Sequence, residues 1–140
     1  FSRYGKVFIS SEEVLPPELE PYRLKLPVGR IHHLMAHAAL IFGESATMAS
    51  EGAVLGVPGV YLDPVGRGYT DQQEREYGIV FNFKSTHQED AIQKGIHILE
   101  SENRQMEKWK ETGKRIVREK IDITQKILEI VTAAGRPPTA

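Results

Sequence analysis

The sequence predicts an α/β fold, with a Rossmann-like parallel sheet flanked by helices and a helical C-terminal tail. Four short runs rich in β-branched and aromatic residues have the length of buried strands, and helical patterns lie between them. The runs are residues 6–10, 40–42, 59–62 and 79–83. Strands that alternate with helices are typical of a parallel sheet, in which ligands bind beyond the carboxyl ends of the strands.

The first strand leads into a segment that is not expected to be regular. Residues 15–27 contain four prolines, and proline removes a backbone donor and fixes φ, so this segment is predicted to be an ordered surface loop. In residues 31–39 the apolar side chains recur at i, i+3, i+4 and i+7. That spacing predicts a helix with one buried face.

Residues 40–58, LIFGESATMASEGAVLGVP, are the stretch around which the rest is arranged. They predict a short strand, a polar turn at residues 43–45 and a helix that begins near Ala46. Gly56 can adopt the left-handed conformation that closes a helix, and Pro58 cannot continue one. A strand that enters a helix through a tight turn presents free backbone N–H groups to an anion.

The second half of the chain is predicted to be mainly helical. Residues 71–77 are polar enough for a short surface helix before the strand at residues 79–83. Three helical pieces follow at residues 87–99, 102–119 and 121–131, and residues 135–140 are expected to be frayed. Residues 1–100 are therefore expected to form the Rossmann-like domain, truncated at its N-terminus, and residues 101–140 to pack back on it as helices.

Composition excludes several classes of protein. With 18 basic and 19 acidic residues, the chain lacks the basic surface of a nucleic-acid-binding protein. The absence of cysteine is typical of a reducing cytoplasm, and the longest apolar run is too short for a transmembrane segment. Residues 1–5, FSRYG, read as the last turn of a helix, so we expect the chain to be a fragment of a longer protein.

The turn at residues 43–45 carries the strongest chemical signal. Ser45 is predicted to cap the helix, which leaves the N–H groups of Ala46 and Thr47 free to bind a phosphate at the positive end of the helix dipole. Glu51 lies four residues after Thr47 on the same face, where its carboxylate can accept two hydrogen bonds from a ribose diol. The alternative is a capped helix that binds nothing and a solvated glutamate.

These residues resemble a known signature. The segment from Gly43 to Pro58 looks like the nucleotide-sugar-binding segment in the C-terminal domain of the GT-B superfamily. In UDP-N-acetylglucosamine 2-epimerases the analogous segment has a serine, two small residues, a glutamate six positions after the serine, and then Leu-Gly-x-Pro. Ser45 and Glu51 keep that spacing. GESATMASEGAVLGVP, REYGIVFNF and REKIDIT also resemble an uncharacterised bacterial and archaeal family of GT-B-fold, glycosyltransferase-like proteins, over most of residues 6–125.

The resemblance implies a role for particular residues. Ser45, Ala46 and Thr47 would hold the diphosphate, although Ala46 and Thr47 stand where the epimerases have a glycine pair. Glu51 would hold the ribose, and the base would lie near residues 28–32, with Arg30 and His32 closest. Asp71 and Gln72 would lie near the sugar, although a solvated short helix is an equal alternative there.

The function implied is the donor-binding half of a glycosyltransferase. By the resemblance it would bind a nucleotide sugar, UDP-linked, as substrate and with no cofactor, while an N-terminal domain would supply the acceptor site and the base. The full-length protein would be the enzyme and the 140 residues alone inactive. The alternatives are a UDP-sugar 2-epimerase or hydrolase, and a non-catalytic interaction module with the GT-B fold.

Two further expectations concern metals and partners. His33 and His37 lie four apart on one helical face, but a third ligand and a neighbouring general base are missing, so no metal site is predicted. In GT-B proteins the last helix crosses to the N-terminal domain. Trp109, Met106 or the apolar face of residues 127–131 is therefore expected to be partly uncovered and to favour a homo-oligomer.

Overall fold

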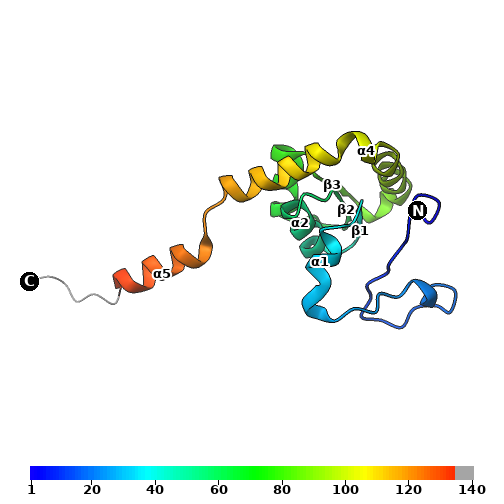
Figure 1. Ribbon diagram of the computed structural model, residues 1–140, viewed down its shortest axis with the longest axis horizontal. Coiled ribbons are helices and arrows are strands. Elements are labelled where there is room, and N and C mark those ends of the chain that lie inside the picture. The colour runs from blue at the N-terminus through cyan, green and yellow to red at the C-terminus, as the bar shows by residue number, and fades with distance from the viewer. Residues whose placement is uncertain (135–140) are drawn as a thin grey trace, which may run out of the picture.

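The computed structural model describes residues 1–134, apart from the side chains of residues 102 and 103, and the prediction for residues 135–140 lies outside that range. The fold is α/β, with a small parallel sheet flanked by helices (Figure 1). The strands β1 (Ile41–Gly43), β2 (Gly59–Leu62) and β3 (Val80–Phe83) lie in the order β1-β2-β3. Their carboxyl ends meet at one edge, because Gly43 pairs with Tyr61 and Leu62 with Phe83. This arrangement is consistent with the predicted Rossmann-like sheet.

Five α-helices accompany the strands. They are α1 (Ile31–Met35), α2 (Ala46–Val54), α3 (Gly68–Gln72), α4 (Gln88–Glu119) and α5 (Ile123–Ala134). The helix α1 precedes β1, α2 and α3 connect the strands, and α4 and α5 follow β3. A π-helical turn, Gln73–Tyr77, continues α3, and single 3₁₀ turns occupy Glu20–Tyr22, Val28–Arg30 and Ser85–His87. Among residues 1–134, no helix combines the length and the apolar character that a membrane crossing requires.

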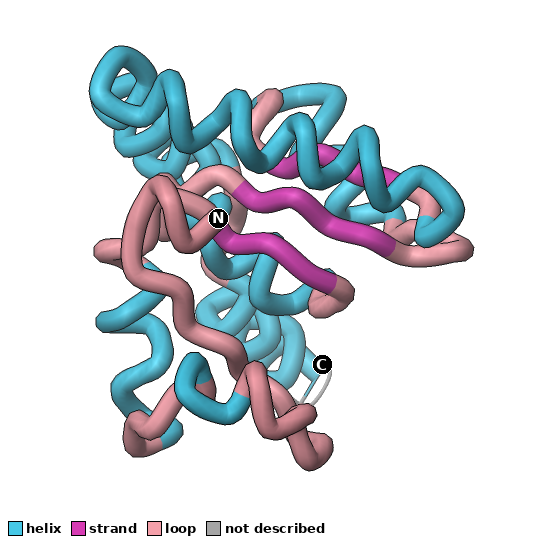
Figure 2. Tube along the Cα trace, turned by 90° about the vertical axis from the view of Figure 1, so that its right-hand side faces the viewer, coloured by secondary structure: helices cyan, strands magenta, loops and turns pink. Residues whose placement is uncertain are grey.

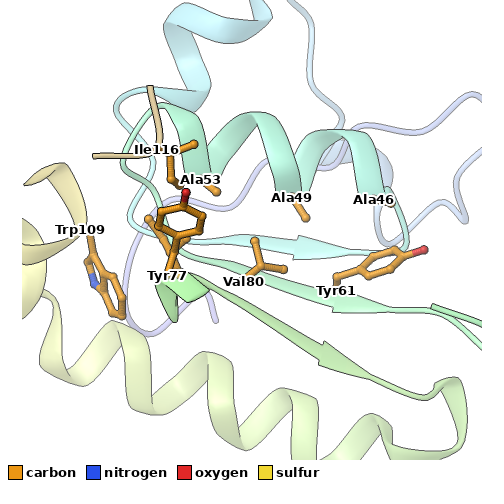
Figure 3. Packing of buried hydrophobic residues seen from close by; sticks show 9 residues of the cluster. Ala46, Ala49, Ala53, Tyr61, Tyr77, Val80, Trp109 and Ile116 are labelled. Atoms are coloured by element: carbon orange, nitrogen blue, oxygen red, sulfur yellow. The ribbon is translucent and has the colours of Figure 1, made fainter. Parts of the chain in front are cut away.

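The sheet is the middle of three layers (Figure 2). Successive side chains of a strand point to opposite faces, so Tyr61 packs with α2 while its neighbours Val60 and Leu62 pack with α4. Figure 3 shows the α2 side, where small side chains of the helix lie directly over the strands. The buried residues there are Ala46, Ala49, Ala53, Tyr61, Tyr77, Ile79, Val80, Trp109 and Ile116.

The strand predicted at residues 6–10 is wrong. This segment joins the rest of the chain only through an isolated parallel bridge between Ile9 and Arg23, in which Ile9 N–H donates to Tyr22 and Leu24 N–H donates to Ile9. A run of β-prone residues becomes a strand only beside a partner strand. The partner here is the proline-rich loop, and proline cannot donate to a ladder.

The two helices predicted at residues 87–99 and 102–119 are one helix, α4. The sequence between them contains neither glycine nor proline, so nothing in it ends a helix. The first half of α4 buries Ala91 and Ile98 on the sheet, and the second half buries Trp109 and Ile116 next to α2. By contrast, every residue of α5 is exposed, and in Figure 1 this helix points away from the sheet.

Candidate functional site

The N-terminal end of α2 lies at the carboxyl edge of the sheet, directly after β1. Ser45 is the N-cap, as predicted: its backbone is extended and its hydroxyl accepts a hydrogen bond from Met48 N–H at 3.3 Å. The first N–H groups of a helix have no intrahelical acceptor. With Met48 satisfied by the cap, the N–H groups of Ala46 and Thr47 remain at the open end of the helix, where the dipole favours an anion.

Glu51 lies on α2 one turn deeper than Thr47, and it contacts a second predicted residue. His32 of α1 approaches it, with 3.1 Å between His32 Nε2 and Glu51 Oε2. Both side chains are about half exposed, so the pair is open to a ligand. The contact joins the residue predicted for the ribose to a residue predicted for the base.

The other predicted residues do not join this pair in the same way. Arg30 is exposed in the 3₁₀ turn before α1. Gln72 donates its amide to Glu76, in the π-helical turn that continues α3, at 2.8 Å, and Asp71 is exposed beside the turn at Gly66. The described contacts therefore bring Asp71 and Gln72 to the same edge of the sheet without linking either to Ser45 or Glu51.

Gln73, the next residue, points inward instead. Its side chain is 8% exposed and donates to Ser50 of α2, at 2.9 Å to the hydroxyl and 3.3 Å to the carbonyl. This bridge fixes the start of the π-helical turn to the middle of α2, one residue before Glu51. The α3 segment is thus held against the candidate site by Gln73, and not by the two residues that precede it.

Sequence reasoning missed Asp63, which follows β2 at the same edge. Gly43 and Tyr61 are register partners, so Ser45 and Asp63 each lie two residues beyond a paired position on adjacent strands. Asp63 Oδ1 accepts hydrogen bonds from Val65 N–H at 2.6 Å and Gly66 N–H at 3.2 Å. An aspartate followed by proline and, three residues on, by glycine is the signal that could have identified this turn.

Two further groups complete the Asp63 turn. Tyr61 donates its hydroxyl to Asp63 Oδ2, and Arg67 Nη2 lies 3.7 Å from the same oxygen. Burial, together with this hydrogen bond to a carboxylate, raises the pKa of Tyr61 to about 12, so the phenol remains a donor near neutral pH. The bonds from Tyr61 and the two backbone N–H groups lower the pKa of Asp63.

The turn is expected to lose stability in acid. Because the pKa of Asp63 is lowered in the folded state, its contribution is complete above the ordinary aspartate pKa of about 4 and is lost as the pH falls through the folded-state value. Asp63→Asn should therefore be less stable than the wild type at pH 7, and the difference should shrink below about pH 4. Urea unfolding at several pH values measures it. Asp71→Asn is the control, and a pH-independent difference for Asp63→Asn would contradict the assignment.

Two hollows of the described surface lie away from the N-terminal end of α2. The larger one is at the C-terminal end of α2, lined by Val54, Leu55, Lys110, Lys114, Val117 and Arg118. Among the side chains that the structure describes, no three of His, Cys, Asp or Glu are grouped so as to hold a metal ion. The chain matches no protein-family model, no curated protein and no solved structure in the comparisons made. The chemistry of the candidate site therefore rests on the residues at the N-terminal end of α2.

Proposed function

We propose that the chain binds a nucleoside-diphosphate sugar, with UDP as the nucleotide, at the N-terminal end of α2, as the donor-binding half of a glycosyltransferase. The observation that supports this proposal best is the contact between His32 and Glu51. The resemblance predicted one residue for the base and the other for the ribose, which are neighbours in any nucleotide. The two residues lie on different helices, and their side chains are in contact.

The spacing along α2 also suits a nucleotide. The diphosphate would accept hydrogen bonds from the N–H groups of Ala46 and Thr47, with the dipole of α2 behind them. Glu51 follows Ala46 by about 7.5 Å along the helix axis, a span that a diphosphate and the attached ribose can bridge. The carboxylate would accept hydrogen bonds from the ribose diol, and His32 would then face the base.

The contribution of this half to reaction would be to hold the donor and stabilise the leaving group. Backbone N–H groups that are fixed before the reaction can stabilise charge that develops on the diphosphate when the glycosidic bond breaks. Under the proposal the acceptor and the catalytic base come from a separate domain. Donor binding by this chain can then be measured without any turnover.

Calorimetry with UDP, UMP and uridine tests the proposal. Glu51→Gln is expected to weaken the binding of both UDP and uridine about tenfold or more, because a hydrogen bond to a charged group contributes about 1.5–3 kcal/mol. Thr47→Glu should weaken UDP much more than uridine, since it places a negative charge beside the phosphates.

Glu44→Gln is the matched control, because Glu44 is an exposed glutamate just before the cap. It should leave the affinity for uridine unchanged. Circular dichroism verifies that each variant folds. If Glu51→Gln binds UDP as tightly as the wild type does, the ribose assignment is wrong; if wild-type protein binds neither UDP nor uridine, the proposed function fails.

A further inference from the structure

A groove runs along the second half of α4, where this helix passes the C-terminal end of α2. It has a volume of about 380 Å³, and its walls are Val54, Leu55, Lys110, Lys114, Val117 and Arg118. Val54 is 41% exposed and Val117 is 60% exposed. A second hollow, which shares Lys110, continues it toward Met106, another exposed apolar side chain. The groove therefore combines exposed valine side chains with three cationic ones, Lys110, Lys114 and Arg118.

The helix α5 carries a stripe of apolar side chains that no other part of the described chain covers. Five large aliphatic side chains on it are between 54% and 61% exposed: Ile123, Ile127, Leu128, Ile130 and Val131. A helix of this length is marginal in water on its own, and most helical stability comes from packing an apolar face. Packing this apolar stripe into a groove would therefore stabilise α5.

The groove and the stripe match in length and in charge. The twelve residues of α5 span about 18 Å, as does α4 between Met106 and Arg118. Lys110, Lys114 and Arg118 follow one another at one-turn spacing along the groove. Lys110 Nζ donates to the Ala36 carbonyl at 3.0 Å and keeps two further N–H donors. The contacts of Lys114 and Arg118 with Glu111 are exposed and therefore weak. Asp122 and Glu129 lie seven residues apart beside the stripe, and the contact of Glu129 with Lys126 is exposed and therefore weak.

The geometry of the chain directs α5 away from its own groove. Lys120 ends α4 with an extended backbone, φ −95° and ψ 148°, and α5 then continues outward (Figure 1). We propose that α5 of one copy occupies the α2–α4 groove of a second copy, and the reverse, in a dimer that exchanges helices. A two-fold axis satisfies both grooves and both stripes, so that the assembly closes at two copies.

Disulfide trapping tests the exchange directly, because the chain contains no cysteine. A chain with Val54→Cys and a tagged chain with Ile127→Cys are mixed at a concentration where the dimer forms and are then oxidised. The expected product is a disulfide-linked heterodimer that contains one chain of each kind. In sedimentation, the wild type should be a dimer that dissociates on dilution, and Ile127→Glu should weaken its association at least tenfold.

Val14→Cys in place of Val54→Cys is the control, since Val14 is 93% exposed in the proline-rich loop. That pair should give no heterodimer. Ile127→Glu should fold normally because α5 buries nothing in one copy. A wild-type chain that stays monomeric at high concentration overturns the proposal. So does a Val54→Cys, Ile127→Cys double variant whose disulfide forms only within single chains, since α5 would then cover its own groove.

Discussion

Gly113→Ala is expected to destabilise the fold by about 2 kcal/mol, even though alanine is the better helix former. A Cβ atom at position 113 would lie 2.6 Å from Gly56 N, 2.8 Å from Gly56 Cα and 3.0 Å from the carbonyl oxygen of Val54. Alanine gains about 1 kcal/mol of helix propensity, while overpacking costs about 1–3 kcal/mol and occasionally more. The atoms in the way are backbone and cannot rotate aside, so the upper end of that cost applies.

Chemical denaturation of Gly113→Ala against the wild type gives this difference. Gly29→Ala is the matched control, because a Cβ atom at Gly29 would meet nothing within 4 Å. We expect it to change the free energy of unfolding by less than about 0.5 kcal/mol. Equal stability of Gly113→Ala and the wild type would mean that α4 does not cross α2 at this close distance.

Trp109→Ala is expected to cost about 3–5 kcal/mol, the usual range for deleting a buried large aromatic side chain. Trp109 is 6% exposed and packs edge-on against Phe81, with 6.3 Å between the ring centroids. Its indole Nε1 is buried and has no hydrogen-bond partner among the described residues. Trp109→Phe therefore loses volume but no hydrogen bond, and it should cost less than half as much.

Thermal and urea unfolding followed by circular dichroism measure both variants, because Trp109 is the single tryptophan and its fluorescence disappears with it. The comparison between phenylalanine and alanine separates packing from hydrogen bonding. If the two substitutions cost the same, the indole N–H has a partner whose loss dominates, and the packing argument is wrong.

The parts of the fold that depend on local chemistry could be predicted from the sequence. Ser45 caps α2 and Gly56 closes it with φ +75°, because a hydroxyl at an N-cap and a residue without a Cβ at a left-handed position act within one turn. The strand at residues 6–10 could not be decided in this way. A strand exists only if a distant segment pairs with it, and local propensity carries no information about that segment.

The same distinction between local features and contacts of distant residues applies to the candidate site. The capped end of α2 follows from residues 43–48 alone. The contact between His32 and Glu51 spans nineteen positions and depends on where α1 lies relative to α2. Both residues could be predicted from the sequence, but the contact between them could not. The inward turn of Gln73 likewise depends on Ser50, a residue with no chemical signal of its own.

The contact between Gly56 and Gly113 also fixes the direction in which α2 points. The two backbones touch there with no side chain between them, so the C-terminal end of α2 is pinned to α4 while its other end carries the candidate anion site. The helix is about 14 Å long, and a tilt of about 5° at the pinned end moves the Ser45 end by about 1 Å. The close contact at Gly113, at the far end of α2, thus determines where the N-terminal end of α2 and its candidate anion site lie.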